Sequence, residues 1–192
     1  MIQERLPPDQ MLGLIQWHID RYDRLRASTS SRAAVLLSAN TLLLAGLALI
    51  TNFHVNTRRQ LAAVWSLLLL FPLIFTLGLV LLSMWACIGA IASTRKRKTN
   101  RNTLKASLPN RFVFNWSDTV KTTVDHQGFA AKLLGSDYDD VLTAATAELW
   151  TDVRQHSQRH KHLRRGVAFF QICVLSFFLL AMLILIADWP AP

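Results

Sequence analysis

The sequence predicts an all-α membrane protein with three transmembrane helices. Three long stretches, residues 33–57, 60–94 and 166–187, contain no Asp, Glu, Lys or Arg. A helix needs roughly 20 mostly apolar residues to cross the hydrocarbon layer of a bilayer, where it must satisfy its own backbone polar groups. Each stretch is long enough to do so. The polar remainder is too small and too divided to form an independent soluble core, so we expect its helices to pack on one another.

The distribution of positive charge orients the chain. Of the 21 Lys and Arg residues, 5 precede the first stretch, 2 lie between the first and second, 14 lie between the second and third, and none follows the third. Positive residues near span ends are retained on the cytoplasmic side, so we expect the N-terminus inside and the C-terminus outside. Anionic headgroups attract cations beside the spans. The net charge of +9 therefore indicates lipid contact, and no nucleic-acid partner is expected.

These patterns divide the chain into consecutive segments. We expect a cytoplasmic amphipathic helix in residues 1–32, transmembrane helix 1 in 33–53, an external loop in 54–61, transmembrane helix 2 in 62–92, a cytoplasmic basic helical region in 93–165, transmembrane helix 3 in 166–187, and an external tail in 188–192. About 32 mostly polar residues precede the first apolar run, so this run does not have the form of a cleaved signal peptide and we expect it to remain as an anchor.

The first segment reads as an amphipathic helix that runs straight into the first span. Its apolar residues Leu12, Ile15, Ile19 and Tyr22 are three or four apart, which places them on one helical stripe. No proline lies between residues 9 and 51. We therefore expect one continuous helix to join the cytoplasmic segment to transmembrane helix 1.

The first two spans each contain one residue that is unusual inside a membrane. Asn40 should face another helix, because a polar group in hydrocarbon is costly unless it finds a partner. It either fixes helix packing through an interhelical hydrogen bond or takes part in gating. Pro72 removes one backbone bond from the second span and predicts a kink, static or hinged. Trp65 and Trp85, with about 30 Å of helix between them, mark the two membrane interfaces.

The basic region should contain short helices and then a long one. The run at residues 95–98 is a stop-transfer signal. Phe112, Phe114 and Trp116 alternate as in a short strand, although packing on neighbouring helices or headgroups is favoured. Residues 119–134 predict a helix interrupted by Gly128.

A long helix should follow this region. Ser136 and Asp139 have the form of a capping box at a helix start. Residues 140–187 contain no proline, and Leu142, Ala145 and Leu149 begin a stripe with helical spacing. We therefore expect a cytoplasmic helix that is continuous with the third span.

The arginines near the first and third spans are the best candidates for a ligand site. On the predicted topology both sets emerge on the same side of the membrane. Arginine forks hold phosphate oxygens bidentately, so the two sets together would bind a small anionic ligand. The alternative is pairing within one helix, such as Asp20 with Arg24, together with headgroup contact. The two sets comprise Arg21, Arg24, Arg26 and Arg32, and then Arg154, Arg159, Lys161, Arg164 and Arg165.

Other kinds of site find little support. The seven glycines never form a phosphate-binding loop, and helical spacing does not assemble a Ser, His and Asp triad, so no enzymatic activity is expected. His156 and His160 are four apart, but the cations around them would repel a metal, and a solvated or pH-sensitive face is favoured. We expect neither a metal nor a cofactor. Cys87 and Cys173 lie within spans and indicate no disulfide framework.

The chain resembles the transmembrane Pycsar effectors over almost its whole length. The resemblance starts with WHIDRYDRLRAS at residues 17–28 and RAAVLLSAN at residues 32–40. It continues through the hairpin of two spans, the cytoplasmic helical segment, and a third span entered through a basic helix that ends with HKHLRR at residues 160–165. The Arg-x-Asp element of the family maps to Arg21 and Asp23, and its polar span residue maps to Asn40.

The resemblance implies a role in bacterial defence against phage. A partner pyrimidine cyclase would make a cyclic pyrimidine mononucleotide, cyclic CMP or cyclic UMP, during infection, and this protein would respond by impairing the inner membrane. Growth arrest or abortive infection would follow. With Asp23 added, and without Arg32 and Lys161, the candidate ligand-binding residues are Arg21, Asp23, Arg24, Arg26, Arg154, Arg159, Arg164 and Arg165. The candidate gating or packing residues are Asn40 and Pro72.

Two other expectations accompany this one. We expect a homo-oligomer in the bilayer. The competing interpretation is a non-catalytic membrane anchor or subunit that docks a partner protein through its cytoplasmic helices. A constitutive transporter is disfavoured, because such proteins usually carry ionisable residues inside the membrane and the three stretches contain no Asp, Glu, Lys or Arg.

Overall fold

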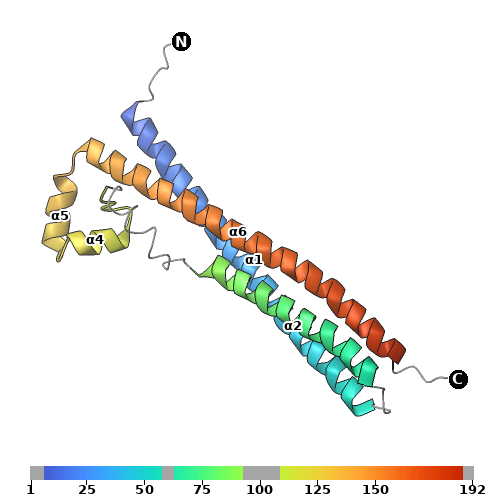
Figure 1. The fold of residues 1–192 in the computed structure, drawn as a ribbon. Helices are drawn as coiled ribbons and strands as arrows, with labels where there is room; N and C mark the ends of the chain where they lie inside the picture. Colours follow the sequence, from blue (N-terminus) through green and yellow to red (C-terminus); the bar gives the residue numbers. More distant parts are fainter. Residues whose placement is uncertain (1–6, 58–62, 93–108, 188–192) are drawn as a thin grey trace, which may run out of the picture. The chain divides into compact units, whose positions relative to one another are not determined.

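The computed structural model describes residues 7–57, 63–92 and 109–187, and over these residues the chain forms five helices and no strand (Figure 1). The helices are α1 (Pro8–Thr57), α2 (Ala63–Ile91), α4 (Trp116–Thr122), α5 (His126–Leu134) and α6 (Tyr138–Ala187). The predicted all-α class is confirmed. The second half of the expected external loop, residues 58–61, the stop-transfer run at residues 95–98 and the tail at 188–192 lie outside the described residues. The first half of that loop, residues 54–57, is helical and belongs to α1.

The chain divides into two compact units. Residues 1–27 and 94–157 form one, which we call the polar unit, and residues 28–93 and 158–192 form the other, which we call the three-helix unit. Helices α1 and α6 are each 50 residues long and contribute to both units. The predicted continuity of the polar helices with the first and third apolar stretches is confirmed. Helices α1, α2 and α6 are all long and apolar enough to cross a membrane.

The core of the three-helix unit repeats every seven residues on all three helices. This is the period of helices that pack side by side along one seam. The clusters of buried contacts follow it: Ala33 packs with Ala90 at one level, and Leu47 packs with Leu69 and Leu180 at another. The buried positions with this spacing are Ala33, Asn40 and Leu47 on α1, Leu69, Thr76, Ser83 and Ala90 on α2, and Gly166, Cys173 and Leu180 on α6.

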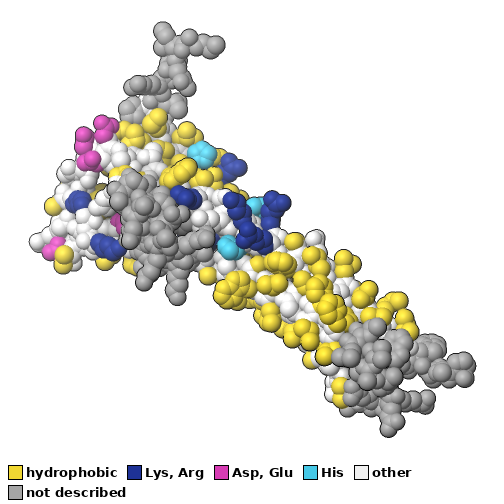
Figure 2. Space-filling model, in the orientation of Figure 1, with side chains coloured by type: hydrophobic (Ala, Val, Ile, Leu, Met, Phe, Trp, Pro, Cys, Tyr) yellow, Lys and Arg dark blue, Asp and Glu magenta, His cyan; other side chains and the backbone are white. Residues whose placement is uncertain are grey.

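Along the three charge-free stretches the outer surface of the three-helix unit is apolar, whereas part of its interior is polar. Leu42, Phe71 and Leu175 are 75%, 75% and 72% exposed, and the face of this unit in Figure 2 is covered by hydrophobic side chains. Asn40 and Ser83, in contrast, are fully buried. An exposed apolar surface of this kind is unstable in water. The unit is therefore built to face hydrocarbon.

The polar unit turns the apolar stripes of its two long helices inward, and each stripe has one buried residue. On α1, Ile15 is buried, and on α6, Ala145 is buried. Phe112 is also buried, with its ring 5.6 Å from that of Phe129 and the Lys132 Nζ atom 5.0 Å away. Phe112 thus packs on a neighbouring helix, as the favoured interpretation of the aromatic run expected, while Trp116 is 75% exposed.

Two expectations about helix ends in this unit are wrong. The interruption expected at Gly128 lies at residues 123–125 instead, because Asp125 caps a new helix by accepting a hydrogen bond from the Gly128 amide at 2.7 Å. The capping box of α6 does not form, because the Ser136 hydroxyl donates to the Lys132 carbonyl at 2.6 Å instead. Asp137 precedes α6, and its side chain accepts from the Tyr138 amide.

Candidate ligand and helix-packing sites

The eight predicted ligand residues divide between the two units. Seven of the eight side chains are exposed, as a site open to a soluble ligand requires, and Arg159 is buried, at 4% exposure. The polar unit contains Arg21, Asp23, Arg24, Arg26 and Arg154, and the three-helix unit contains Arg159, Arg164 and Arg165.

In the polar unit, α1 and α6 meet around Tyr22 and His156, whose ring centroids are 5.8 Å apart. One turn before His156, burial is the main reason why the pKa of Asp152 is raised to about 6. The negative charges of Glu148 and Asp23 raise this pKa further, and the positive charges of Arg26 and Arg111 lower it. Asp23 and Arg26, both predicted from sequence, therefore share the electrostatic environment of Asp152.

Arg21 has a different setting on the same helix. Its guanidinium lies over the Trp17 ring, 5.4 Å from the centroid. A planar cation stacked on an aromatic ring is held in a defined place at little conformational cost. Trp17 in turn packs edge-on against His18, with ring centroids 4.9 Å apart. The sequence indicated Arg21 but not the aromatic surface that positions it.

A network around Arg111 was missed by the sequence interpretation. Its Nε donates to Asp118 at 3.1 Å, and its Nη1 donates to Glu148 at 2.8 Å and to Thr151 at 3.1 Å. Asn115 also donates to Glu148, at 3.3 Å. This network holds the segment before α4 and the start of α4 against α6. Asp118 is seven residues from Arg111, but the partners on α6 are 33 to 40 residues away, so no local spacing could have revealed them.

In the three-helix unit, Asn40 joins α1 to α2 as one of its two interpretations expected. Its Nδ2 donates to the Ser83 Oγ at 3.0 Å and to the Leu36 carbonyl at 2.8 Å. The Ser83 hydroxyl in turn donates to the Gly166 carbonyl on α6, at 3.0 Å. The Asn40 Oδ1 accepts no hydrogen bond from any described residue. One polar chain thus connects all three helices.

A second polar contact lies two helical turns away on α2. The Thr76 hydroxyl is 2.6 Å from the Ser176 hydroxyl on α6, and it also donates to the Pro72 carbonyl at 2.7 Å. The Cys173 thiol donates to the Thr76 carbonyl. Thr76 and Ser83 are seven residues apart, like the other core positions of α2. That spacing, within a charge-free stretch, was the signal that could have identified both.

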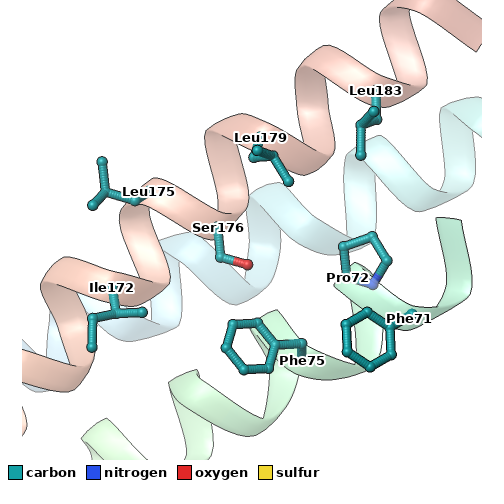
Figure 3. Close-up of a pocket in the computed structure, with 8 residues that line it drawn as sticks. All are labelled: Phe71, Pro72, Phe75, Ile172, Leu175, Ser176, Leu179 and Leu183. Carbon is teal, nitrogen blue, oxygen red and sulfur yellow. The ribbon is translucent and has the colours of Figure 1, made fainter. Parts of the chain in front are cut away.

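Pro72 borders an open groove between α2 and α6, of about 510 Å³ (Figure 3). All the lining side chains are apolar except Ser176, whose hydroxyl is already bonded to Thr76. A groove without charge does not suit an anionic ligand. The lining residues are Phe71, Pro72, Phe75, Ile172, Leu175, Ser176, Leu179 and Leu183.

Together these features define the class of the protein: a helical membrane protein that carries a polar unit on two of its apolar helices. The profile of the PycTM family, described as Pycsar effector protein domain, matches residues 15–187. The chain therefore belongs to the Pycsar effector transmembrane family. Searches of curated proteins and of solved structures gave no match.

Proposed function

We propose that this chain is a non-catalytic antiphage effector that senses a cyclic pyrimidine mononucleotide and then impairs the bacterial inner membrane. Cyclic CMP or cyclic UMP, made by a partner pyrimidine cyclase during infection, is the signal, and growth arrest or abortive infection is the outcome. The observation that carries this proposal is the family match over residues 15–187. The apolar surface of the three-helix unit supports the membrane as the target.

The nucleotide binds in the polar unit through arginines on α1 and α6. Arg21, Arg24 and Arg154 are exposed, and a guanidinium pairs with two phosphate oxygens at once. Asp23 and Arg26 lie beside Asp152 at the contact between the two helices. A nucleotide that engages both helices would therefore change how they pack on each other. It shifts the balance only if it binds the active arrangement more tightly.

The signal reaches the membrane along the same two helices. Both α1 and α6 continue without a break from the polar unit into the three-helix unit, and an α-helix transmits displacement because its backbone is hydrogen-bonded throughout. In the proposed arrangement the polar unit is cytoplasmic, the C-terminus is outside, and several copies assemble in the inner membrane.

The test is nucleotide binding by the purified full chain in detergent, measured by equilibrium dialysis with cyclic CMP and cyclic UMP. Arg21→Ala and Arg154→Ala should each weaken binding about tenfold, as loss of one charge-assisted contact does. Lys121→Ala, an exposed cation on α4, is the matched control and should bind as the native chain does. If the native chain binds neither nucleotide, the proposal fails.

A second candidate function is a membrane anchor that docks a partner protein. Trp17, Trp116 and Trp150 are 50%, 75% and 54% exposed on the polar unit, and exposed Trp residues are enriched at protein interfaces. This function predicts a partner that co-purifies stoichiometrically. It also predicts that the membrane potential of cells expressing the chain is the same with and without cyclic pyrimidine nucleotide.

A further inference from the structure

The three-helix unit contains a polar seam, which we define as the buried residues Asn40, Ser83 and Thr76 together with the half-buried Ser176. Asn40, Thr76 and Ser83 are 0%, 1% and 0% exposed, although the outer surface of the same unit is apolar. They occupy adjacent levels of the seven-residue repeat, so the seam follows the contact line of the three helices. Polar side chains inside a membrane-spanning unit are costly, and in membrane proteins they usually have a function.

The bonds of the seam differ from the other polar bonds in the same helices. Asn40 bonds to Ser83, and Ser83 bonds to the Gly166 carbonyl, so α1, α2 and α6 are tied together. Ser38 and Thr41 also lie on α1, but they are exposed and donate only to carbonyls of their own helix, at 3.2 Å and 2.6 Å. Only a bond between helices is broken when the helices separate.

Such bonds matter more here than apolar packing does. Lipid chains are as apolar as the outer side chains, so burying those side chains hardly drives helix association in a bilayer. Interhelical hydrogen bonds and close packing of small residues hold the helices instead. The seam also has a built-in weakness, because the Asn40 Oδ1 is buried and accepts no hydrogen bond from the described residues. Because this oxygen gains no hydrogen bond from the described part of the chain when the helices are closed, the closed arrangement is less stable than a fully hydrogen-bonded one and opens more readily.

We propose that the polar seam is the lock of the effector. It keeps α1, α2 and α6 closed in the absence of nucleotide, and its opening admits water between the helices and lets small ions cross the membrane. Once the helices part, the hydroxyl and amide groups lose their protein partners and are satisfied by water. This inference rests on the proposed function, because it says how the membrane is impaired.

The chain carries two natural reporters of this opening. Cys87 and Cys173 are its only cysteines, and both are free and fully buried. Cys173 donates to the Thr76 carbonyl, and a Cβ atom added at Gly166 would lie 3.1 Å from the Cys87 Sγ. Alkylation by N-ethylmaleimide requires both access and water for the thiolate, so it reports an open and hydrated seam.

The variants Ser83→Ala and Thr76→Val break the seam with almost no change of shape. Ser83→Ala removes two interhelical bonds, and Thr76→Val removes the bond to Ser176. The matched controls are Ser38→Ala and Thr41→Val, which make the same chemical changes on the exposed face of α1. In vesicles of phosphatidylethanolamine and phosphatidylglycerol without nucleotide, both seam variants should be alkylated about tenfold faster than the native chain, and both controls at the native rate. Equal alkylation rates for all five chains, or equal increases in seam variants and controls, would overturn the proposal that the seam keeps the three helices closed.

A nucleotide titration separates this inference from the proposed function. Added cyclic CMP or cyclic UMP should raise alkylation of the native chain and collapse a potassium diffusion potential across the vesicles. The seam variants should collapse the potential at a lower nucleotide concentration, or with none. If the native chain collapses the potential while its two thiols stay protected, the lock is wrong and the effector function stands. If neither nucleotide affects the potential, the effector function is wrong, and the alkylation of the seam variants still decides whether the seam closes the unit.

Discussion

The two units of this protein are built in opposite ways. The three-helix unit buries Asn40, Thr76 and Ser83 and exposes large apolar side chains. The polar unit buries Ile15, Ala145 and similar apolar residues and exposes most of its charges. The difference shows which solvent each unit faces. In water, burial of apolar side chains stabilises the fold, whereas in hydrocarbon interhelical hydrogen bonds and close packing hold the helices together.

The opposition also explains why hydrogen bonds serve different ends in the two units. In the three-helix unit an interhelical bond contributes roughly 0.6 to 1.7 kcal/mol, which is similar to the coupling of 1 to 3 kcal/mol that a ligand usually supplies. A ligand coupled to the three helices with this strength would be able to overcome about two such bonds. In the polar unit, the Arg111 network adds specificity to a core that apolar burial already stabilises at about 25 cal/mol per Å². The first arrangement suits a switch and the second a scaffold.

The largest expected effect comes from a charge placed on the outer surface of the three-helix unit, compared with a charge placed on the surface of the polar unit. Leu175→Arg, at a residue 72% exposed on the three-helix unit, should cost about 3 kcal/mol of insertion free energy, because arginine at the centre of a span is excluded from hydrocarbon. Trp116→Arg, at a residue 75% exposed on the polar unit, should change stability by less than about 0.5 kcal/mol. The fraction of chain recovered in membranes measures both. Equal recovery of the two variants would contradict the opposed design.

The next largest effect should follow from removal of the Glu148 carboxylate, which accepts a hydrogen bond from Arg111. Glu148→Ala deletes the bonds from Arg111 and Asn115 and leaves their donors partly buried, so it should destabilise the polar unit by about 2 kcal/mol. Amide hydrogen exchange in residues 111–134 of the full chain measures the loss. Asp20→Ala, at an exposed carboxylate of α1, is the control and should leave the exchange unchanged. Protection equal to that of the native chain would show that the network is dispensable.

Two glycines offer a smaller and sharper comparison. An alanine Cβ at Gly166, in the three-helix unit, would lie 3.1 Å from the Cys87 Sγ, whereas at Gly13, in the polar unit, it would meet nothing within 4 Å. Gly166→Ala should therefore destabilise the chain by about 1 to 2 kcal/mol through overpacking. Gly13→Ala should stabilise it by about 0.5 to 1 kcal/mol, because alanine favours the helix. Melting temperatures in detergent should shift in opposite directions, and shifts of the same sign would refute the difference in packing.

The smallest expected effect is a pH dependence confined to the polar unit. The pKa of Asp152 is raised from 3.8 to about 6 by burial and by nearby carboxylates. The folded state therefore holds this proton more tightly than the unfolded state does. Its contribution is present below about pH 4 and is lost as the pH rises through about 6. After allowance for solvent screening at this half-buried group, the change should be about 1 kcal/mol.

Asp152→Asn isolates this pH dependence. The variant should protect the polar unit at pH 7 better than the native chain does, and the difference should vanish near pH 4.5. Amide exchange in residues 138–157, corrected for its intrinsic pH dependence, measures it. Glu148, Asp23, Arg26 and Arg111 surround Asp152, and Tyr22 and His156 lie at the same helix contact. All of them are present in both chains, so the difference between the two chains reports the loss of the Asp152 carboxyl. A difference that does not vary with pH would contradict the raised pKa.

Much of the fold followed from local features of the chain. The absence of charge in three stretches and the absence of proline between residues 9 and 51 were enough to predict the continuous helix α1. The amphipathic stripe of Leu12, Ile15 and Ile19 was enough to predict which face it buries. These are predictable because helix formation and membrane insertion depend on residues that are neighbours in sequence.

The contacts between distant residues were less predictable. Asn40 was expected to meet another helix, but nothing near it identified Ser83 as its partner or the Gly166 carbonyl as the acceptor of the Ser83 hydroxyl. The expected capping box failed because Ser136 has a competing acceptor, the Lys132 carbonyl, at the end of the preceding helix. The interruption expected at Gly128 within residues 119–134 lies a few residues earlier, because Asp125 caps the second helix. In the last two cases two local patterns competed, and a local hydrogen bond decided between them.

The sequence by itself thus determined the helices, their order along the chain and the solvent that each part faces, because charge and hydropathy act residue by residue. The tertiary structure alone decided which polar groups meet inside each unit: the seam of Asn40, Ser83 and Thr76 in one, and the Arg111 network in the other. Those pairings depend on the rotation and register of helices about one another. Interhelical packing sets both, over separations of 33 to 100 residues in the chain.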